Sequence, residues 1–302
     1  MSFQPWELVA GLGIFLYGMM VLEQALRTLG TRAFRHILRD YTNTPVRGVM
    51  MGVISTASLG TTFTGWIVAT IGFKLSLTQY AMPLLAVGTL GTVFISSEHR
   101  RHSQARLLLG LGLLLMGLDF MKTNMGTLAE QSIPGVFADY PILLYALGGL
   151  LFTALVQSSS ATMMIVLSAI NAGVMPLTTA AAIMAGANLG TTVTVVLGSL
   201  KGSPDKHRVA LAHFIFHLLS TLIGLVFLYP ILQLISDILT VQDPMYAVVL
   251  YHSLFNLFTI LLFLPFISPF ARWLQNRFAD EDGSGCQFIT KVPASVSDAA
   301  SE

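Results

Sequence analysis

Charged residues are scarce in this sequence. They make up 10% of the 302 residues, against roughly 25% in an ordinary soluble domain. Hydrophobic residues make up 54% of the chain, and the mean hydropathy is +0.73. This composition argues against a soluble protein and indicates one that resides in a membrane.

Cysteine is almost absent. The single cysteine, Cys286, lies in a polar stretch near the C-terminus, which excludes a disulfide framework and a metal site built from several cysteines. Charge is also missing ahead of the first apolar run, because Met1–Trp6 contains no charged residue. We therefore expect this run to be a retained membrane helix and not a signal peptide.

Long apolar runs recur along the chain, each near the roughly 20 residues that an α-helix needs to cross a bilayer. They are Leu8–Leu26, Tyr80–Ser97, Leu107–Met121, Leu177–Leu200, Val209–Tyr229 and Tyr246–Ile267. These runs predict an all-α polytopic protein of the cell (inner) membrane, with the lipid bilayer as its surroundings. No feature of the sequence indicates nucleic-acid binding.

Basic residues cluster between the apolar runs. The positive-inside rule places such clusters in the cytoplasm and places acidic segments with few cations outside. The basic clusters are Arg27–Arg47, Arg100–Arg106, Lys201–Arg208 and Arg272–Arg277, and the acidic segments are Thr123–Tyr140 and Pro230–Pro244.

The chain repeats itself. The pattern Gly11-Leu12-Gly13, with Gly18 further on, returns about 99 residues later as Gly110-Leu111-Gly112 with Gly117. Three further pairs follow in the same order and at nearly the same separation, and they are Thr56-Ala57 with Thr153-Ala154, Leu77-Thr78 with Leu177-Thr178, and Gly91-Thr92 with Gly190-Thr191. Self-similarity at a fixed offset indicates two copies of one structural unit.

The repeat suggests a division of the chain into four parts. The first unit is predicted at 1–106 with a hairpin near 46–73, and the second at 107–208 with a hairpin near 141–172. A last pair of membrane helices follows at 209–271 and carries its own echo, His213-Phe214-Ile215-Phe216 against His252-Ser253-Leu254-Phe255. The remainder, 272–302, is predicted to be a polar, disordered tail.

The polar cluster from Thr153 to Thr162 is the sharpest chemical feature. Gln157, Ser158, Ser159 and Ser160 lie within it, between two apolar half-helices. Irregular backbone at membrane depth survives only where protein or a water-filled cavity covers it, so we expect a break here. The helix that follows would present backbone N–H groups, a positive dipole end and serine hydroxyls, which together make an anion site without a fixed charge.

A second cluster, Gly186–Thr194, offers oxygen ligands of the kind that sodium needs, from Asn188, Thr191, Thr192 and backbone carbonyls. Broken helices in repeated units are typical of the binding sites of secondary transporters. The glycines have an alternative explanation, because small residues also allow membrane helices to pack closely without any ligand.

These motifs resemble the signature of the type II sodium-phosphate cotransporter family. The resemblance rests on Gln157–Ser160, on Gly186-Ala187-Asn188-Leu189-Gly190-Thr191-Thr192, and on later elements at Ala212-His213 and His252–Asn256. It implies two inverted repeats, each with a broken or re-entrant helical hairpin. It also implies that the hairpin tips meet around phosphate and sodium.

The first unit departs from the family pattern. Gly60-Thr61-Thr62-Phe63 stands where the family has a first Gln-Ser-Ser-Ser, and the family's C-terminal regulatory domain is not expected in this chain. The resemblance implies phosphate binding by Gln157, Ser158, Ser159, Ser160, Thr61 and Thr62. It implies sodium binding by Gln157, Ser160, Asn188, Thr191 and Thr192, with sodium as the coupling ion and no other metal or cofactor.

Two alternative functions remain open from the sequence. The same fold could carry another anion or use protons as the driving ion, because the first tip has diverged. An intramembrane enzyme would need a serine of Ser158–Ser160 activated by His213, His217 or His252, and no spacing in the sequence fixes such a contact. His213 and His217, four residues apart, could also hold a metal, pack as a polar pair or handle protons.

Overall fold

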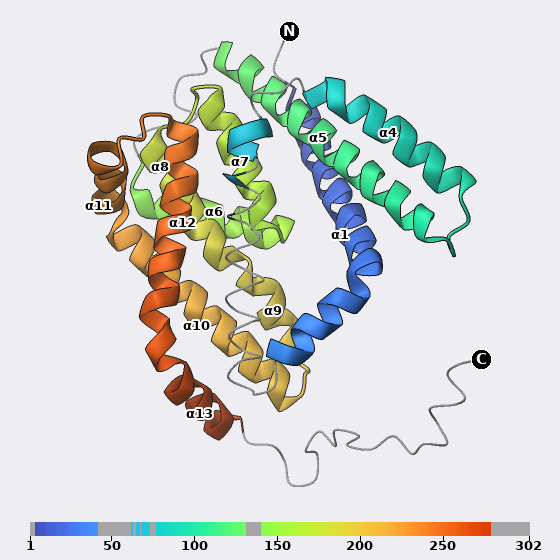
Figure 1. Cartoon of the computed structure of the whole chain (residues 1–302). Helices are drawn as coiled ribbons and strands as arrows, with labels where there is room; N and C mark the ends of the chain where they lie inside the picture. Colours follow the sequence, from blue (N-terminus) through green and yellow to red (C-terminus); the bar gives the residue numbers. More distant parts are fainter. Residues whose placement is uncertain are drawn as a thin grey trace, which may run out of the picture.

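The computed structural model describes residues 4–41, 62, 65–66, 68–72, 77–130 and 140–278. Every regular element among these residues is a helix (Figure 1). The elements are α1 (Pro5–Tyr41), η2 (Val68–Gly72), α4 (Leu77–Phe94), α5 (Arg100–Glu130), α6 (Ile142–Val156), α7 (Ser159–Asn171), α8 (Leu177–Gly190), α9 (Thr192–Ser199), α10 (Pro204–Val226), α11 (Leu228–Gln233), η3 (Leu234–Ile238), α12 (Pro244–Phe263), η4 (Leu264–Phe266) and α13 (Ile267–Arg277).

Six stretches of the described chain are long and apolar enough to cross a membrane, and each overlaps one of the predicted runs. They are Pro5–Leu26, Leu77–Phe94, Arg100–Glu130, Leu177–Ser199, Pro204–Val226 and Pro244–Arg277. The prediction of an all-α polytopic membrane protein is therefore confirmed.

Helices α1, α4 and α5 form one group, and the helices from α6 to α13 form another (Figure 1). One apolar core joins the two groups. Phe15 of α1 and Leu118 of α5 are fully buried in it together with Met163 and Leu167 of α7 and Val249 of α12. Helix α7 thus lies at the boundary between the groups.

Glycines hold α1 and α5 in close contact. A Cβ atom on Gly18 would lie 2.8 Å from the carbonyl oxygen of Gly110, and one on Gly117 would lie 2.6 Å from that of Gly11. Gly11 and Gly110 are equivalent in the repeat, as are Gly18 and Gly117. Gly18 thus packs against Gly110, the counterpart of Gly11, while Gly117, the counterpart of Gly18, packs against Gly11 itself. An antiparallel pair of equivalent helices shows such reciprocal contacts.

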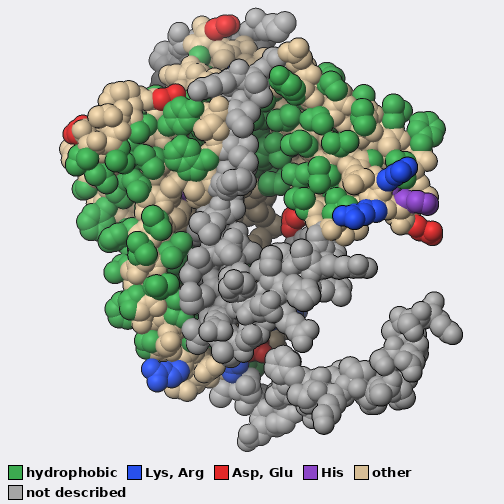
Figure 2. All heavy atoms as spheres, in the orientation of Figure 1, with side chains coloured by type: hydrophobic (Ala, Val, Ile, Leu, Met, Phe, Trp, Pro, Cys, Tyr) green, Lys and Arg blue, Asp and Glu red, His purple; other side chains and the backbone are tan. Residues whose placement is uncertain are grey.

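Charged side chains gather toward the ends of the molecule (Figure 2). Lys and Arg lie at the lower end, where Figure 1 places α13 and the start of α10, and also at the right edge, near the turn between α4 and α5, whereas Asp and Glu are spread over the upper, right and lower parts. Between these ends the visible surface carries many hydrophobic side chains. This arrangement suits a protein whose middle faces lipid.

The predicted boundaries at 106, 208 and 271 fall inside α5, α10 and α13, and the division into four parts stays a prediction. Runs of charged residues lie at these boundaries, and they occupy the first turns of α5 and α10 and the body of α13. A membrane helix can extend beyond the hydrocarbon core into the polar headgroup region, so a charge run does not mark the end of a helix. Most of the hairpin predicted near 46–73 and the tail from 279 onward lie outside the described residues.

Candidate functional site

The polar cluster of the second unit interrupts the helix, as predicted. Helix α6 ends at Val156, and Gln157 adopts the left-handed conformation with φ 60° and ψ 25°. Ser158 is extended, with φ −147° and ψ 107°, and α7 begins at Ser159. The two helices are only about 22 Å and about 20 Å long, too short to cross a hydrocarbon core of about 30 Å singly.

A pair of buried threonines shows that the chain folds back at this break. The Oγ1 atoms of Thr153 and Thr162 lie 2.7 Å apart. In an unbroken helix their positions would be separated by about 13 Å along the axis. Helices α6 and α7 therefore form a hairpin whose tip consists of Gln157 and Ser158, and the Thr153–Thr162 hydrogen bond joins its two arms.

Ser158 caps the second arm of this hairpin. Its Oγ atom accepts a hydrogen bond from the N–H of Ala161 at 3.2 Å. Gln157 is exposed, and Ser158, Ser159 and Ser160 are half-buried. The first turn of a helix has N–H groups without partners inside the helix, and the positive end of the helix dipole lies there. This tip can therefore bind an anion through neutral donors.

No Asp, Glu, Lys or Arg occurs in the sequence between Tyr140 and Lys201. The whole hairpin and α8 thus carry no formal charge. An anion at the tip would interact only with dipoles and hydroxyls of this segment. A positive charge to balance the anion would therefore have to come from a bound cation or from another part of the protein.

Glycines bring α8 against the first arm of the hairpin. A Cβ atom on Gly186 would overlap the backbone carbonyl of Ala146, and one on Gly149 would overlap that of Ile183. Helix α8 is continuous through Gly186 to Gly190. At these glycines the structure therefore shows close helix packing and not a broken helix.

The end of α8 lies beside the arm that leads to the tip. A Cβ atom on Gly190 would lie 2.7 Å from the Cβ of Thr153 and 3.2 Å from the N of Ala154. The interruption that follows is a single residue, Thr191, before α9 begins at Thr192. Two predicted sodium ligands, Thr191 and Thr192, are thereby placed at the helix end that borders the hairpin.

Asn188, the third predicted ligand on this segment, is engaged elsewhere. Its Oδ1 atom lies 3.0 Å from Nδ1 of His217, and its Nδ2 atom donates to Ser220 Oγ at 3.1 Å. Both partners belong to α10. Thr191 and Thr192 donate to the carbonyl oxygens of Asn188 and Leu189, so their hydroxyls already have backbone partners.

Thr62, Gly65 and Trp66 of the first unit, which we call the first-unit segment, lie beside α12, and Gly65 also lies against α7. A Cβ atom on Gly65 would overlap the sulfur of Met163 on α7 and would lie 3.5 Å from Cγ1 of Val249 on α12. The predicted ligand Thr61 and its neighbours Gly60 and Phe63 lie outside the described residues. The structure thus brings part of the first unit against the helix that begins at the serines.

A buried polar cluster connects α8, α10 and α12. It consists of Asn188, His217, Ser220, His252 and Asn256, all buried. The sequence pointed to this region through the echo between the two His-x-x-Phe patterns and through the family element His252–Asn256, but neither signal revealed that these side chains meet Asn188.

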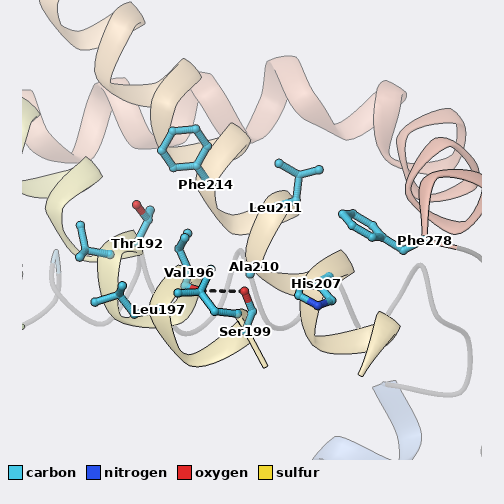
Figure 3. A pocket seen from close by; sticks show the side chains of 11 residues that line it. Thr192, Val196, Leu197, Ser199, His207, Ala210, Leu211, Phe214 and Phe278 are labelled. Atoms are coloured by element: carbon cyan, nitrogen blue, oxygen red, sulfur yellow. Dashed lines mark hydrogen bonds between the residues drawn. The ribbon is translucent and has the colours of Figure 1, made fainter. Parts of the chain in front are cut away.

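An apolar cavity of about 400 Å³ lies between α9 and α10 (Figure 3). Val196, Leu197, Leu211 and Phe214 are among the side chains that line it, and Phe278 closes one side. Its lining has few polar atoms, so it does not offer the donors that an anion requires.

Comparison with known proteins agrees with the motifs. The sequence profile of the Na+/Pi-cotransporter family matches residues 14–59, 53–123 and 141–239. YjbB of Salmonella typhimurium, which is named as a proposed inorganic phosphate export protein, is 27% identical over 241 residues, covering 78% of this chain and 41% of YjbB. The human sodium-dependent phosphate transport protein 2C is 34% identical over 120 residues, covering 36% of this chain and 20% of that protein.

YqeW of Bacillus subtilis, whose name states no function, is 35% identical over 80 residues, which cover 26% of each protein. The chain thus spans less than half of the length of these curated relatives. No solved structure matches it. Because the profile matches cover both units and the hairpin with its Gln-Ser-Ser-Ser tip, the chain belongs to the Na+/Pi-cotransporter family.

Proposed function

We propose that this protein is a secondary active transporter that carries phosphate across the cell (inner) membrane together with sodium. It would act as a transporter and not as an enzyme. The observation that carries the proposal is the hairpin tip at Gln157 and Ser158, where a membrane-embedded chain breaks and presents a helix start with three adjacent serines. Family membership and the names of the relatives favour phosphate as the anion.

Charge balance supports sodium as the companion ion. The hairpin and α8 contain no formal charge, and an unpaired phosphate dianion would be costly in a low-dielectric site. A bound cation lowers this cost. We propose that Gln157, Ser158, Ser159 and Ser160 bind phosphate together with Thr61 and Thr62, and that Gln157 and Ser160 share sodium with Thr191 and Thr192. Asn188 would bind sodium only after its hydrogen bonds to His217 and Ser220 had broken.

We further propose that the two units are inverted repeats that move relative to one another in alternating access. The reciprocal glycine contacts of α1 and α5 support this arrangement, because equivalent helices of inverted units run antiparallel. The basic side chains at the start of α10 and on α13 lie together at the lower end (Figure 2), which supports a cytoplasmic location for that end.

Transport can be measured in proteoliposomes that contain the purified protein. We expect uptake of radioactive phosphate to follow an inward sodium gradient and to stop when potassium replaces sodium. Gln157→Ala and Ser159→Ala should abolish most of this flux. Uptake that ignores the sodium gradient would refute the coupling, and unaffected variants would refute the site.

Ser168→Ala is a matched control on the same helix. The Ser168 hydroxyl is buried on α7 and has no hydrogen-bond partner among the residues that the structure describes, and it lies about 13 Å from Ser159 along the helix axis. Its removal should leave phosphate flux unchanged. Flux driven by a proton gradient, or flux of another anion in place of phosphate, would instead support the alternative that the fold carries a different substrate or uses a different driving ion.

A further inference from the structure

A chain of hydrogen bonds leads from the first-unit segment through α12 to α8. Oγ1 of Thr62 lies 3.2 Å from Nδ1 of His252, and Nε2 of His252 lies 3.1 Å from Nδ2 of Asn256. Oδ1 of Asn256 accepts from Ser220 at 3.3 Å and from Asn188 at 3.4 Å. Residues far apart in the sequence are thereby joined in one buried path.

The bonding partners fix the orientation of the His252 ring and its tautomer. Nδ2 of Asn256 also donates to the backbone oxygen of His252 at 2.8 Å, which identifies it as the amide nitrogen. An amide nitrogen can only donate, so Nε2 of His252 must accept. In the neutral ring the proton then lies on Nδ1, which donates to Thr62.

The residue after His252 holds the same segment. Nε1 of Trp66 donates to Oγ of Ser253 at 3.0 Å, and the Trp66 ring stacks on Tyr246 with a centroid distance of 6.2 Å. Two adjacent side chains of α12 therefore bond to two residues of the first-unit segment. Apolar packing alone would not select these particular positions.

We infer that His252 is a positioning residue, which holds the first-unit segment beside α7 through Thr62 and is itself oriented by Asn256 and Asn188. This inference rests on the proposed function, because it assigns His252 a role in assembling the phosphate site from the two units. His252 acts through Thr62 and need not touch the transported ion. The Gln-Ser-Ser-Ser motif does not contain this residue.

Two substitutions separate the contacts of the ring. The amide of asparagine can place a donor near the position of Nδ1, whereas the longer glutamine places its amide near Nε2. His252→Asn should therefore keep the bond to Thr62, and His252→Gln should keep only the bond to Asn256. We expect His252→Gln to raise the KM for phosphate by about fivefold, the effect of one lost neutral hydrogen bond, with little change in the maximal rate. Thr62→Val, which also removes a hydroxyl proposed to bind phosphate, should raise KM by at least as much.

The double variant tests whether the two residues act together. If His252 works through Thr62, Thr62→Val combined with His252→Gln should raise KM no more than Thr62→Val alone. His252→Asn should stay near the wild-type KM, and so should His99→Gln, which changes an exposed histidine in the turn between α4 and α5. Multiplying effects in the double variant, or an unchanged KM in His252→Gln, would overturn the inference.

Fluorescence of Trp66 gives a second measurement that does not depend on transport. The other two tryptophans, Trp6 and Trp273, are exposed and can be replaced by phenylalanine. In this background His252→Gln should make Trp66 more accessible to an aqueous quencher, and His252→Asn should not. Equal quenching of the two variants would refute positioning by His252. If the wild type showed this docking but carried no phosphate, the proposed function alone would fail.

Discussion

Replacing Gly186 by alanine tests the contact that sets the hairpin against α8. The added Cβ would overlap the carbonyl oxygen, carbonyl carbon and Cα of Ala146. All three are backbone atoms, so no change of rotamer can relieve the overlap. Helices α6 and α8 would have to move apart.

The size of the effect follows from two opposing contributions. Overpacking a close contact costs about 1–3 kcal/mol, and replacing a helical glycine by alanine gains up to about 1 kcal/mol. We expect Gly186→Ala to lower the free energy of unfolding by about 1–2 kcal/mol. Because α6 carries the tip at its end, the displacement should also weaken phosphate binding.

Gly148→Ala is the matched control for this measurement. Gly148 lies on α6 next to Gly149, and a Cβ there would meet no atom within 4 Å. This variant should show only the gain from helix propensity. Unfolding of both variants can be followed in the same detergent, and the reasoning fails if Gly186→Ala is as stable as Gly148→Ala.

Three further substitutions test single features of the site. Gln157→Gly should raise the free energy of unfolding by about 1 kcal/mol, because glycine adopts the left-handed conformation without a steric penalty. Phosphate flux should be lost together with the amide. A free energy of unfolding below that of the wild type would contradict this reasoning. Ser158→Ala removes the acceptor for the N–H of Ala161 and should lower the free energy of unfolding by about 0.5–2 kcal/mol, measured by thermal unfolding. His217→Ala leaves Oδ1 of Asn188 buried without its partner and should cost about 1–3 kcal/mol; an unchanged melting temperature would show that another donor replaces His217.

The membrane spans and the break could be predicted from the sequence because each depends on local chemistry. The side chains of a long apolar run are stable only in lipid or in a protein core. A polar cluster such as Gln157–Ser160 between such runs therefore predicts a break in the helix. The left-handed conformation of Gln157 and the cap at Ser158 confirm this interpretation.

The environment of Asn188 could not be predicted, because it depends on the direction in which a helix turns its side chains. Its partners His217 and Ser220 come from α10, and Asn256 comes from α12. Which face of α8 meets those helices is decided by tertiary packing. For Gly186, glycine is compatible with both close packing and unwinding, so the sequence left both open and the structure shows packing.

If the protein transports phosphate as we propose, its contacts also indicate where the two units would separate. Helices α6 and α8 approach through their backbones at Gly149 and Gly186, and buried hydrogen bonds from Asn188 join α8 to α10 and α12, so these four helices should move as one body. Toward this body α1 and α5 present apolar side chains such as Phe15 and Leu118, and apolar packing is not directional. Two neutral hydrogen bonds, from Thr62 and Trp66, join the first-unit segment to α12, and each is worth about 1 kcal/mol net. Thermal motion can break bonds of this size, so the boundary along α7 is where we expect alternating access to occur.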